Sequence, residues 1–397
     1  MASEMRSLKR ALRPVIWLNC LFCMGIFEIP MNHPRYFLSI LYTISMFSGY
    51  FYMFYAGLDL FQNMPDYEYF IFCAVLGVNI LVAIFAVILF WLKSENMNNI
   101  IKKNSLADST LEALGIKREY EKTSRNVNWI IGFWLTIMVI LNIMHMLWIY
   151  TEGYWFAIYS DICFLFPIVI NSVVDITFAS FIRCIKLKFK NINILLNNVV
   201  LRASESNVFK IHNQHENTSI AIVRAHYKND KDKIIHLMQT LRQLHLEITQ
   251  IGKEINNTYC IQLLLELAVH FTIVTSTTYC LYGVFFGQLR MMVNDEKIVA
   301  MIVFGTVYSL KIILVNWLCT SVSEEAYKTG EIIQSFEGST IDDDMREEIH
   351  QFTQQIVLKS LSFTAAGFFS IDNSLTGKFF ATVTTYVVIL IQMNAPL

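Results

Sequence analysis

The chain has 397 residues, of which 55% are hydrophobic and only 16% are charged, and its formal net charge is −1. Soluble domains carry about 25% charged residues, so this composition argues against a soluble protein. No cofactor and no nucleic-acid partner are expected.

The apolar residues fall in seven runs long enough to cross a bilayer, whose ~30 Å hydrocarbon core takes ~20 helical residues. They predict an all-α membrane protein with seven transmembrane helices. The runs are Tyr36–Leu58, Tyr69–Leu92, Trp129–Tyr150, Tyr154–Ile182, Cys260–Phe286, Ile298–Thr320 and Ser374–Asn394.

An eighth apolar stretch, Ala11–Glu28, follows a basic segment. It lacks the small-residue cleavage site of a signal peptide. A crossing here would reverse the side on which every later loop lies. We therefore expect an interfacial or re-entrant helix.

The distribution of Lys and Arg predicts the orientation. Of the 31 such residues, 28 lie before the first run, in alternate connections after it or, in the case of Lys378, at the start of the last run; two lie in the other connections, and Lys311 lies within a run. Because basic residues gather on the cytoplasmic side, we expect a cytoplasmic N-terminus and an extracellular C-terminus in a multi-pass plasma-membrane protein. The outer loops are then short, so a small ligand would enter between the outer helix ends.

On this basis the chain divides into six parts. These are a cytoplasmic N-terminal segment with the interfacial helix (1–35), helices 1–4 (36–182), a cytoplasmic anchor segment (183–259), helices 5–6 (260–320), a second anchor segment with the inner part of helix 7 (321–373), and a pore helix (374–397).

The first anchor segment contains an apolar seam at alternating steps of three and four, from Ile234 through Leu244 to Ile255. This period is that of a packed helix, and no proline interrupts it before the fifth span, so a helix of more than fifty residues is expected. The seam packs either within its own subunit or between subunits. The preceding stretch, Val200–Asp232, is polar and is predicted to be a flexible loop.

The last span is predicted to be divided. Phe363–Phe369 is apolar and is predicted to be a short inner helix. It ends near Ser370, Asp372, Asn373 and Ser374, which suit a helix stop followed by the N-cap of a second helix. In that second helix a mostly polar stripe recurs at steps of three and four. It comprises Lys378, Thr382, Thr385, Ile389, Gln392 and Pro396. Such a stripe faces either a wet axis shared by several subunits or the interior of a single bundle. Gln392 by itself suits either a pore lining or a hydrogen bond between helices.

Four ionisable residues, Asp175, Glu266, His270 and Lys311, lie inside predicted spans. Each costs at least ~2.5–3.5 kcal/mol near the bilayer centre unless it is paired or wetted. Asp175 and Lys311 fall at similar depths and are expected to pair. Glu266 and His270 are one turn apart and able to interact.

The outer halves of the spans contain polar and aromatic residues suited to a small-molecule cavity. The candidates are His145, Trp148, Tyr159, Asp161, Thr278, Tyr282 and Thr306. The alternatives are aromatic anchoring at the lipid interface and structural pairing.

Two stretches resemble one family. Thr385-Tyr386, five apolar residues and Gln392 resemble the terminal signature of insect gustatory receptors, and Ala365–Phe369 with Ile371-Asp372 resembles the stretch before it. The length and the predicted topology match over the whole chain. The family usually has Phe after the glutamine, where this chain has Met393. This difference affects the expected detail of the pore constriction and not the resemblance itself.

The resemblance implies a ligand-gated, poorly selective cation channel of four subunits, as a homotetramer or a heteromer with related receptors. A small-molecule tastant would bind among the outer helix halves. The last helices would line the cation pore, through Lys378, Thr382, Thr385, Ile389, Gln392 and Met393. The lower halves of the late helices would join the subunits, and Tyr386 would pack the pore helix against its neighbours.

Three other classes of protein fit the sequence less well. A receptor that signals through G proteins needs the opposite topology, which the charge distribution opposes. A transporter often shows repeated halves or helices broken by Gly or Pro. No repeat is evident in this sequence, and Pro167 is the only proline well inside a predicted span. No paired metal-site motif, phosphate loop or nucleophile elbow is present, so an enzyme is not expected.

Overall fold

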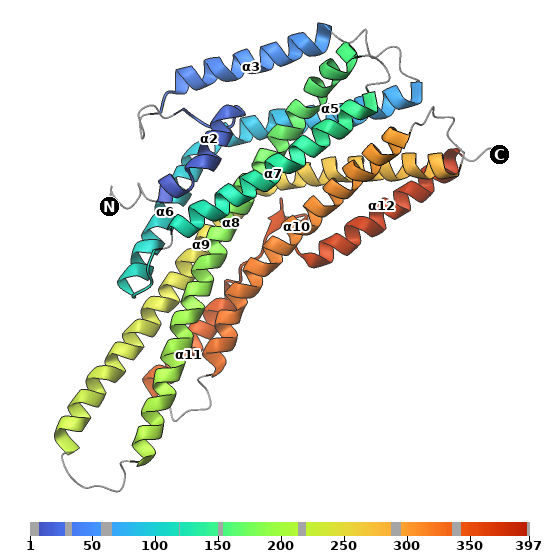
Figure 1. The fold of residues 1–397 in the computed structure, drawn as a ribbon. Helices are drawn as coiled ribbons and strands as arrows, with labels where there is room; N and C mark the ends of the chain where they lie inside the picture. The colour runs from blue at the N-terminus through green and yellow to red at the C-terminus, as the bar shows by residue number, and fades with distance from the viewer. Residues whose placement is uncertain are drawn as a thin grey trace.

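A computed structural model describes residues 8–27, 34–56, 66–118, 120–149, 154–212, 220–286, 295–335 and 343–394. Seven of its helices are long and apolar enough to cross a membrane within this part of the chain. The prediction of an all-α protein with seven transmembrane helices is therefore confirmed. They are α3 (Tyr36–Ala56), α5 (Asp66–Leu92), α7 (Tyr120–Ile149), α8 (Tyr154–His212), α9 (Ile220–Phe285), α10 (Asp295–Gln334) and α12 (Asn373–Asn394) (Figure 1).

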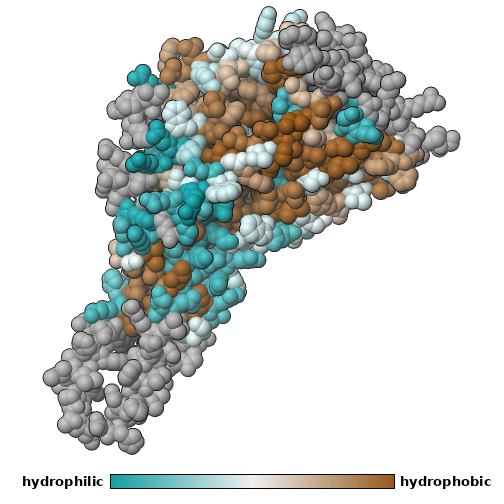
Figure 2. All heavy atoms as spheres, viewed as in Figure 1, coloured by the Kyte–Doolittle hydropathy of each residue, from teal (hydrophilic) through white to brown (hydrophobic). Residues whose placement is uncertain are grey.

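The molecule has an apolar body and a polar stalk. We use "stalk" for residues 183–212, 220–259, 321–335 and 343–372, where α8, α9 and α10 continue past the body and α11 (Asp343–Leu358) packs on them (Figure 1). On the face shown, hydrophobic residues gather over the body, and mostly hydrophilic residues cover the part of the stalk that is coloured (Figure 2). This division is what a bilayer-embedded part and a water-exposed part require.

Two short helices lie beside these long ones. In the segment Ala11–Glu28, α2 (Arg13–Leu21) has nine residues, too few to cross a bilayer, in agreement with the absence of a crossing there. The Asn19 amide donates a 2.9 Å hydrogen bond to the Thr177 hydroxyl and so attaches α2 to α8. The second helix, α6 (Ser94–Ala113), packs against α9.

The predicted long helix is confirmed, because α9 has 66 residues. The seam residues Leu244 and Ile255 are at most 1% exposed and share one buried cluster with Phe189 of α8, Val322 of α10 and Phe352 of α11. The seam thus packs within its own subunit, which decides between the two alternatives.

The flexible loop predicted for Val200–Asp232 is wrong. Helix α8 continues to His212 and α9 begins at Ile220. The stretch is polar but contains no Pro or Gly, the residues that most strongly end a helix. The polarity of the stretch therefore does not by itself end a helix.

The short inner helix predicted for Phe363–Phe369 is also wrong. The chain forms a hairpin of β1 (Thr364–Ala365) and β2 (Phe369–Ser370), paired antiparallel. Its turn places Ala366 and Gly367 at φ values of 51° and 78°, the left-handed region required at both centres of a type I′ turn. Tertiary contact fixes this geometry, since the Thr364 amide donates a 3.0 Å hydrogen bond to the Asn256 side chain of α9.

The N-cap expected within Ser370–Ser374 is confirmed, and the structure assigns it to Asp372. One carboxylate oxygen of Asp372 accepts hydrogen bonds from the backbone N–H groups of Ser374 at 2.8 Å and Leu375 at 3.1 Å. The Ser374 hydroxyl, together with these amides, holds the pKa of the Asp372 carboxyl below its usual value. The hairpin and this cap together set where α12 begins.

Candidate functional site

A buried carboxylate in the predicted outer half of the body connects α7 and α8. Asp161 of α8 is 6% exposed and accepts a 2.5 Å hydrogen bond from the Asn142 amide through one oxygen. Its other oxygen lies 3.1 Å from Nδ1 of His145. Asn142 and His145 are three residues apart on α7 and therefore face α8 together. The structure thus brings two predicted site residues into direct contact and adds Asn142.

Aromatic rings extend this site toward α10. The His145 ring stacks on Phe164 with centroids 4.7 Å apart, and Phe164 meets Phe304 edge-on at 5.9 Å. The polar pair therefore has an apolar wall, the combination found in small-molecule sites.

The other predicted ligand residues are more exposed. Tyr159 is half-buried and, two residues from Asp161, points about 200° away from it around α8. Thr278 and Thr306 are exposed on α9 and α10. Tyr282 is half-buried and stacks on Phe286 at 4.6 Å. The side chain of Trp148 lies outside the described residues.

Two buried hydroxyls belong with this region and were not among the predicted site residues. Ser160 is 0% exposed and Thr275 is 7% exposed, and neither hydroxyl oxygen has a hydrogen-bond partner within the described chain. A buried polar atom without a partner is a natural ligand contact. Ser160 stands between Tyr159 and Asp161 in the sequence, which was the available signal.

Helix α12 has one packed face and one open face. Leu375, Phe379, Val383 and Val387 recur every four residues, are buried, and pack on the chain's own α9 and α10. The six residues predicted to line a pore are all exposed: Lys378, Thr382, Thr385, Ile389, Gln392 and Met393. The stripe therefore faces away from the interior of this subunit. Tyr386 contacts Phe271 of α9 edge-on at 5.3 Å.

The four ionisable residues inside the spans gather around one small cavity of about 40 Å³. Lys311 of α10 forms an ion pair with Asp175 of α8, as predicted. Nδ1 of His270 lies 2.5 Å from the backbone oxygen of Glu266, so these two residues interact through the main chain rather than through the carboxylate.

The cavity also reaches the open-faced helix. Asn316 lines it and donates a 2.9 Å hydrogen bond to the Thr376 hydroxyl of α12. Within the described chain, Oε2 of Glu266 and Nε2 of His270 have no hydrogen-bond partner. The cavity thus connects the ion pair of α8 and α10 with the first turn of α12.

A family model described as "7tm Chemosensory receptor" matches residues 10–394. The chain belongs to this family. The expected likeness to insect gustatory receptors is confirmed by curated relatives from Drosophila melanogaster. Putative gustatory receptor 28b is 21% identical over 94% of this receptor and 77% of its own length. The gustatory receptor for bitter taste 66a is 28% identical over 41% of this receptor and 31% of its own length.

The same fold occurs in a solved structure. The insect olfactory receptor OR5 from Machilis hrabei superimposes with a TM-score of 0.68 at 12% identity, covering 98% of this receptor and 100% of that chain. OR5 has also been solved in complex with eugenol, with the same TM-score at 13% identity. At this identity the match establishes the fold of this receptor.

Proposed function

We propose that this receptor is a tastant-gated, nonselective cation channel of the plasma membrane. The observation that carries the proposal is the exposed stripe of α12, which has Lys378, Thr382 and Gln392 on the side opposite the packed face. Polar side chains on the lipid-facing side of a membrane helix are costly, so they favour a water-filled axis. Four subunits, identical or related, would place their α12 helices around that axis.

The ligand in this proposal is a small tastant held between α7, α8, α9 and α10. Asp161 and His145 would orient it, Phe164 and Phe304 would cover its apolar part, and Ser160 would supply a further hydrogen bond. The likeness to the gustatory receptor for bitter taste 66a favours bitter or other non-sugar compounds. The charge distribution supports a cytoplasmic N-terminus, so the site would open to the outside.

Expression of the receptor alone in a cell line is expected to give ligand-evoked cation current with G-protein signalling blocked. A channel conducts through its own α12 helices and therefore needs no second messenger. Whole-cell recording after a tastant screen by calcium imaging is the measurement. Absence of current despite surface expression would argue against a self-sufficient channel, and current restored by a related receptor would indicate a heteromer.

Replacing Asp161 by Ala is expected to raise the half-maximal concentration of an agonist found in that screen about tenfold or more. The substitution removes the hydrogen bonds that the Asp161 carboxylate makes with Asn142 and His145, each of which contributes about 1.5–3 kcal/mol. The side chains of His145 and Asn142 then lose the contact that orients them. Concentration–response curves provide the measurement. Asp343→Ala is the matched control, because that carboxylate is exposed in the stalk, and its curve should not move. An unchanged curve for Asp161→Ala would remove this residue from the ligand site.

A further inference from the structure

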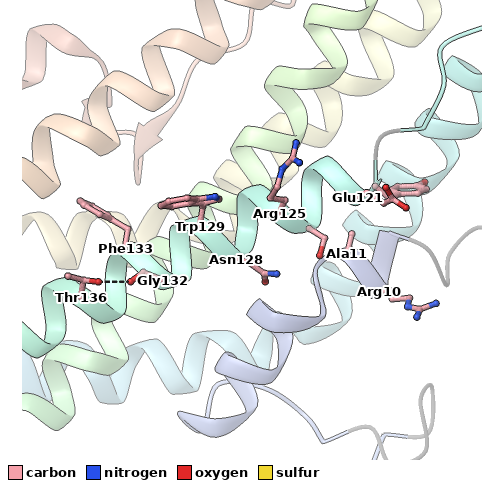
Figure 3. A pocket seen from close by; sticks show the side chains of 11 residues that line it. Arg10, Ala11, Glu121, Arg125, Asn128, Trp129, Gly132, Phe133 and Thr136 are labelled. Atoms are coloured by element: carbon pink, nitrogen blue, oxygen red, sulfur yellow. Dashed lines mark hydrogen bonds between the residues drawn. The ribbon is translucent and has the colours of Figure 1, made fainter.

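An open groove lies at the opposite end of α7 from His145. It is a groove of about 1080 Å³ between the N-terminal half of α7 and the residues just before α2 (Figure 3). The proposed tastant site does not use it. Its lining residues on α7 are adjacent pairs that repeat every four residues, from Tyr120 and Glu121 to Gly132 and Phe133, so they form one continuous stripe along the helix.

The chemistry of the groove changes along its length. Arg125 and Asn128 line one end, and Trp129 and Phe133 line the next turns toward the body (Figure 3). The two rings are 74% and 60% exposed, respectively. A change from polar groups to a tryptophan and then to apolar groups is the pattern at the boundary between lipid headgroups and acyl chains.

Positive charge dominates the polar end. Arg10 lines the groove from the segment before α2 and Arg125 lines it from α7, with their side chains pointing in different directions (Figure 3), while Glu121 is the carboxylate that lines the same end. Among the described residues neither guanidinium forms an ion pair. Guanidinium groups bind phosphate and carboxylate with two parallel hydrogen bonds, so two uncommitted guanidiniums at a headgroup level suit an anionic headgroup.

Gly132 opens a notch between the two rings. A Cβ built there would meet no atom within 4 Å, so the space beside this turn is empty of protein. An acyl chain could lie along the notch, flanked by Trp129 and Phe133. The notch also offers a test, because a larger side chain at 132 fills the groove without displacing its neighbours.

We propose that this groove binds one anionic glycerophospholipid. Its anionic headgroup contacts Arg10 and Arg125, and an acyl chain follows Trp129, Gly132 and Phe133. On the orientation proposed above this lipid belongs to the cytoplasmic leaflet, where anionic lipids are concentrated. The site needs only the membrane location of the receptor and does not depend on ion conduction.

The test is native mass spectrometry of the purified full-length receptor with phosphatidylserine and phosphatidylcholine of identical acyl chains. The wild type is expected to retain phosphatidylserine in preference, by about fivefold for each engaged guanidinium, since one basic residue near an anionic headgroup contributes about 1 kcal/mol. The double variant Arg10→Gln, Arg125→Gln should lose the preference. Equal retention of both lipids by the wild type would overturn the proposal.

Two further variants separate lipid binding from misfolding. Gly132→Leu should reduce the retention of both lipids, because it fills the notch. Gly49→Leu on α3 is the matched control, since its Cβ also meets no atom within 4 Å, and it should leave retention unchanged. A Trp129→Cys variant that forms disulfide-linked dimers in membranes would show that a second copy covers the groove, and this too would overturn the proposal.

Discussion

Replacing Lys311 by Met is expected to lower the free energy of unfolding by about 3–5 kcal/mol, the usual cost of removing one partner from a buried ion pair. The variant leaves the Asp175 carboxylate beside Glu266 in the same small cavity without their cation. Asp175→Asn should cost less, because Lys311 then still has Glu266 nearby. Equilibrium unfolding of the receptor in detergent micelles measures both losses.

The double variant Asp175→Asn, Lys311→Met is expected to be more stable than Lys311→Met alone. Removing both charges leaves no uncompensated charge from the pair, so the two losses should not add. Lys328→Met is the matched control on the same helix, where the side chain is exposed in the stalk, and it should change stability by at most about 0.5 kcal/mol. Unaltered stability of Lys311→Met would mean that the ion pair does not stabilise the body.

Cysteine at position 392 is expected to react with a positively charged aqueous thiosulfonate, and the reaction should abolish most of the ligand-evoked current. Gln392 lies on the open face of α12, so in a shared pore the adduct would place a fixed positive charge on the cation path. The rate of current loss during reagent application is the measurement. The background should carry Cys73→Ser, because Cys73 is an exposed native cysteine.

Two positions on the same helix provide the controls. Val387 is 7% exposed on the packed face, and Leu390 is half-buried between the faces. Cysteine at 387 should be unreactive and cysteine at 390 far slower than at 392. Equal rates at all three positions would contradict a pore lined by this stripe. Met393→Phe on the same background tests whether the residue after the glutamine changes gating.

The membrane class and the helix count could be predicted because a bilayer imposes a minimum apolar length on every crossing. The pairing of Asp175 with Lys311 was predictable for a related reason, since a lone charge in a membrane span is costly and depth can be estimated from position in the span. The N-cap at Asp372 follows from a local hydrogen bond to amides two and three residues on.

The errors came where local signals were weak. Polarity alone does not end a helix, so α8 and α9 run through much of Val200–Asp232. Phe363–Phe369 has an apolar, helix-like composition, but Asn256 of the distant α9 binds the Thr364 amide and supports a hairpin instead. Such a contact joins residues 108 positions apart and leaves no local pattern.

By itself the sequence determined that this is a membrane-embedded protein of seven helices, because hydropathy and helical period are properties of short windows. Its likeness to insect gustatory receptors came instead from the short stretch that holds Thr385, Tyr386 and Gln392. Only the tertiary structure decided that the seam of α9 packs within its own subunit, that the α12 stripe faces outward, and that Asp161 contacts His145 and Asn142. Each of these depends on which faces of distant helices meet, and that choice is made by the packing of the whole body.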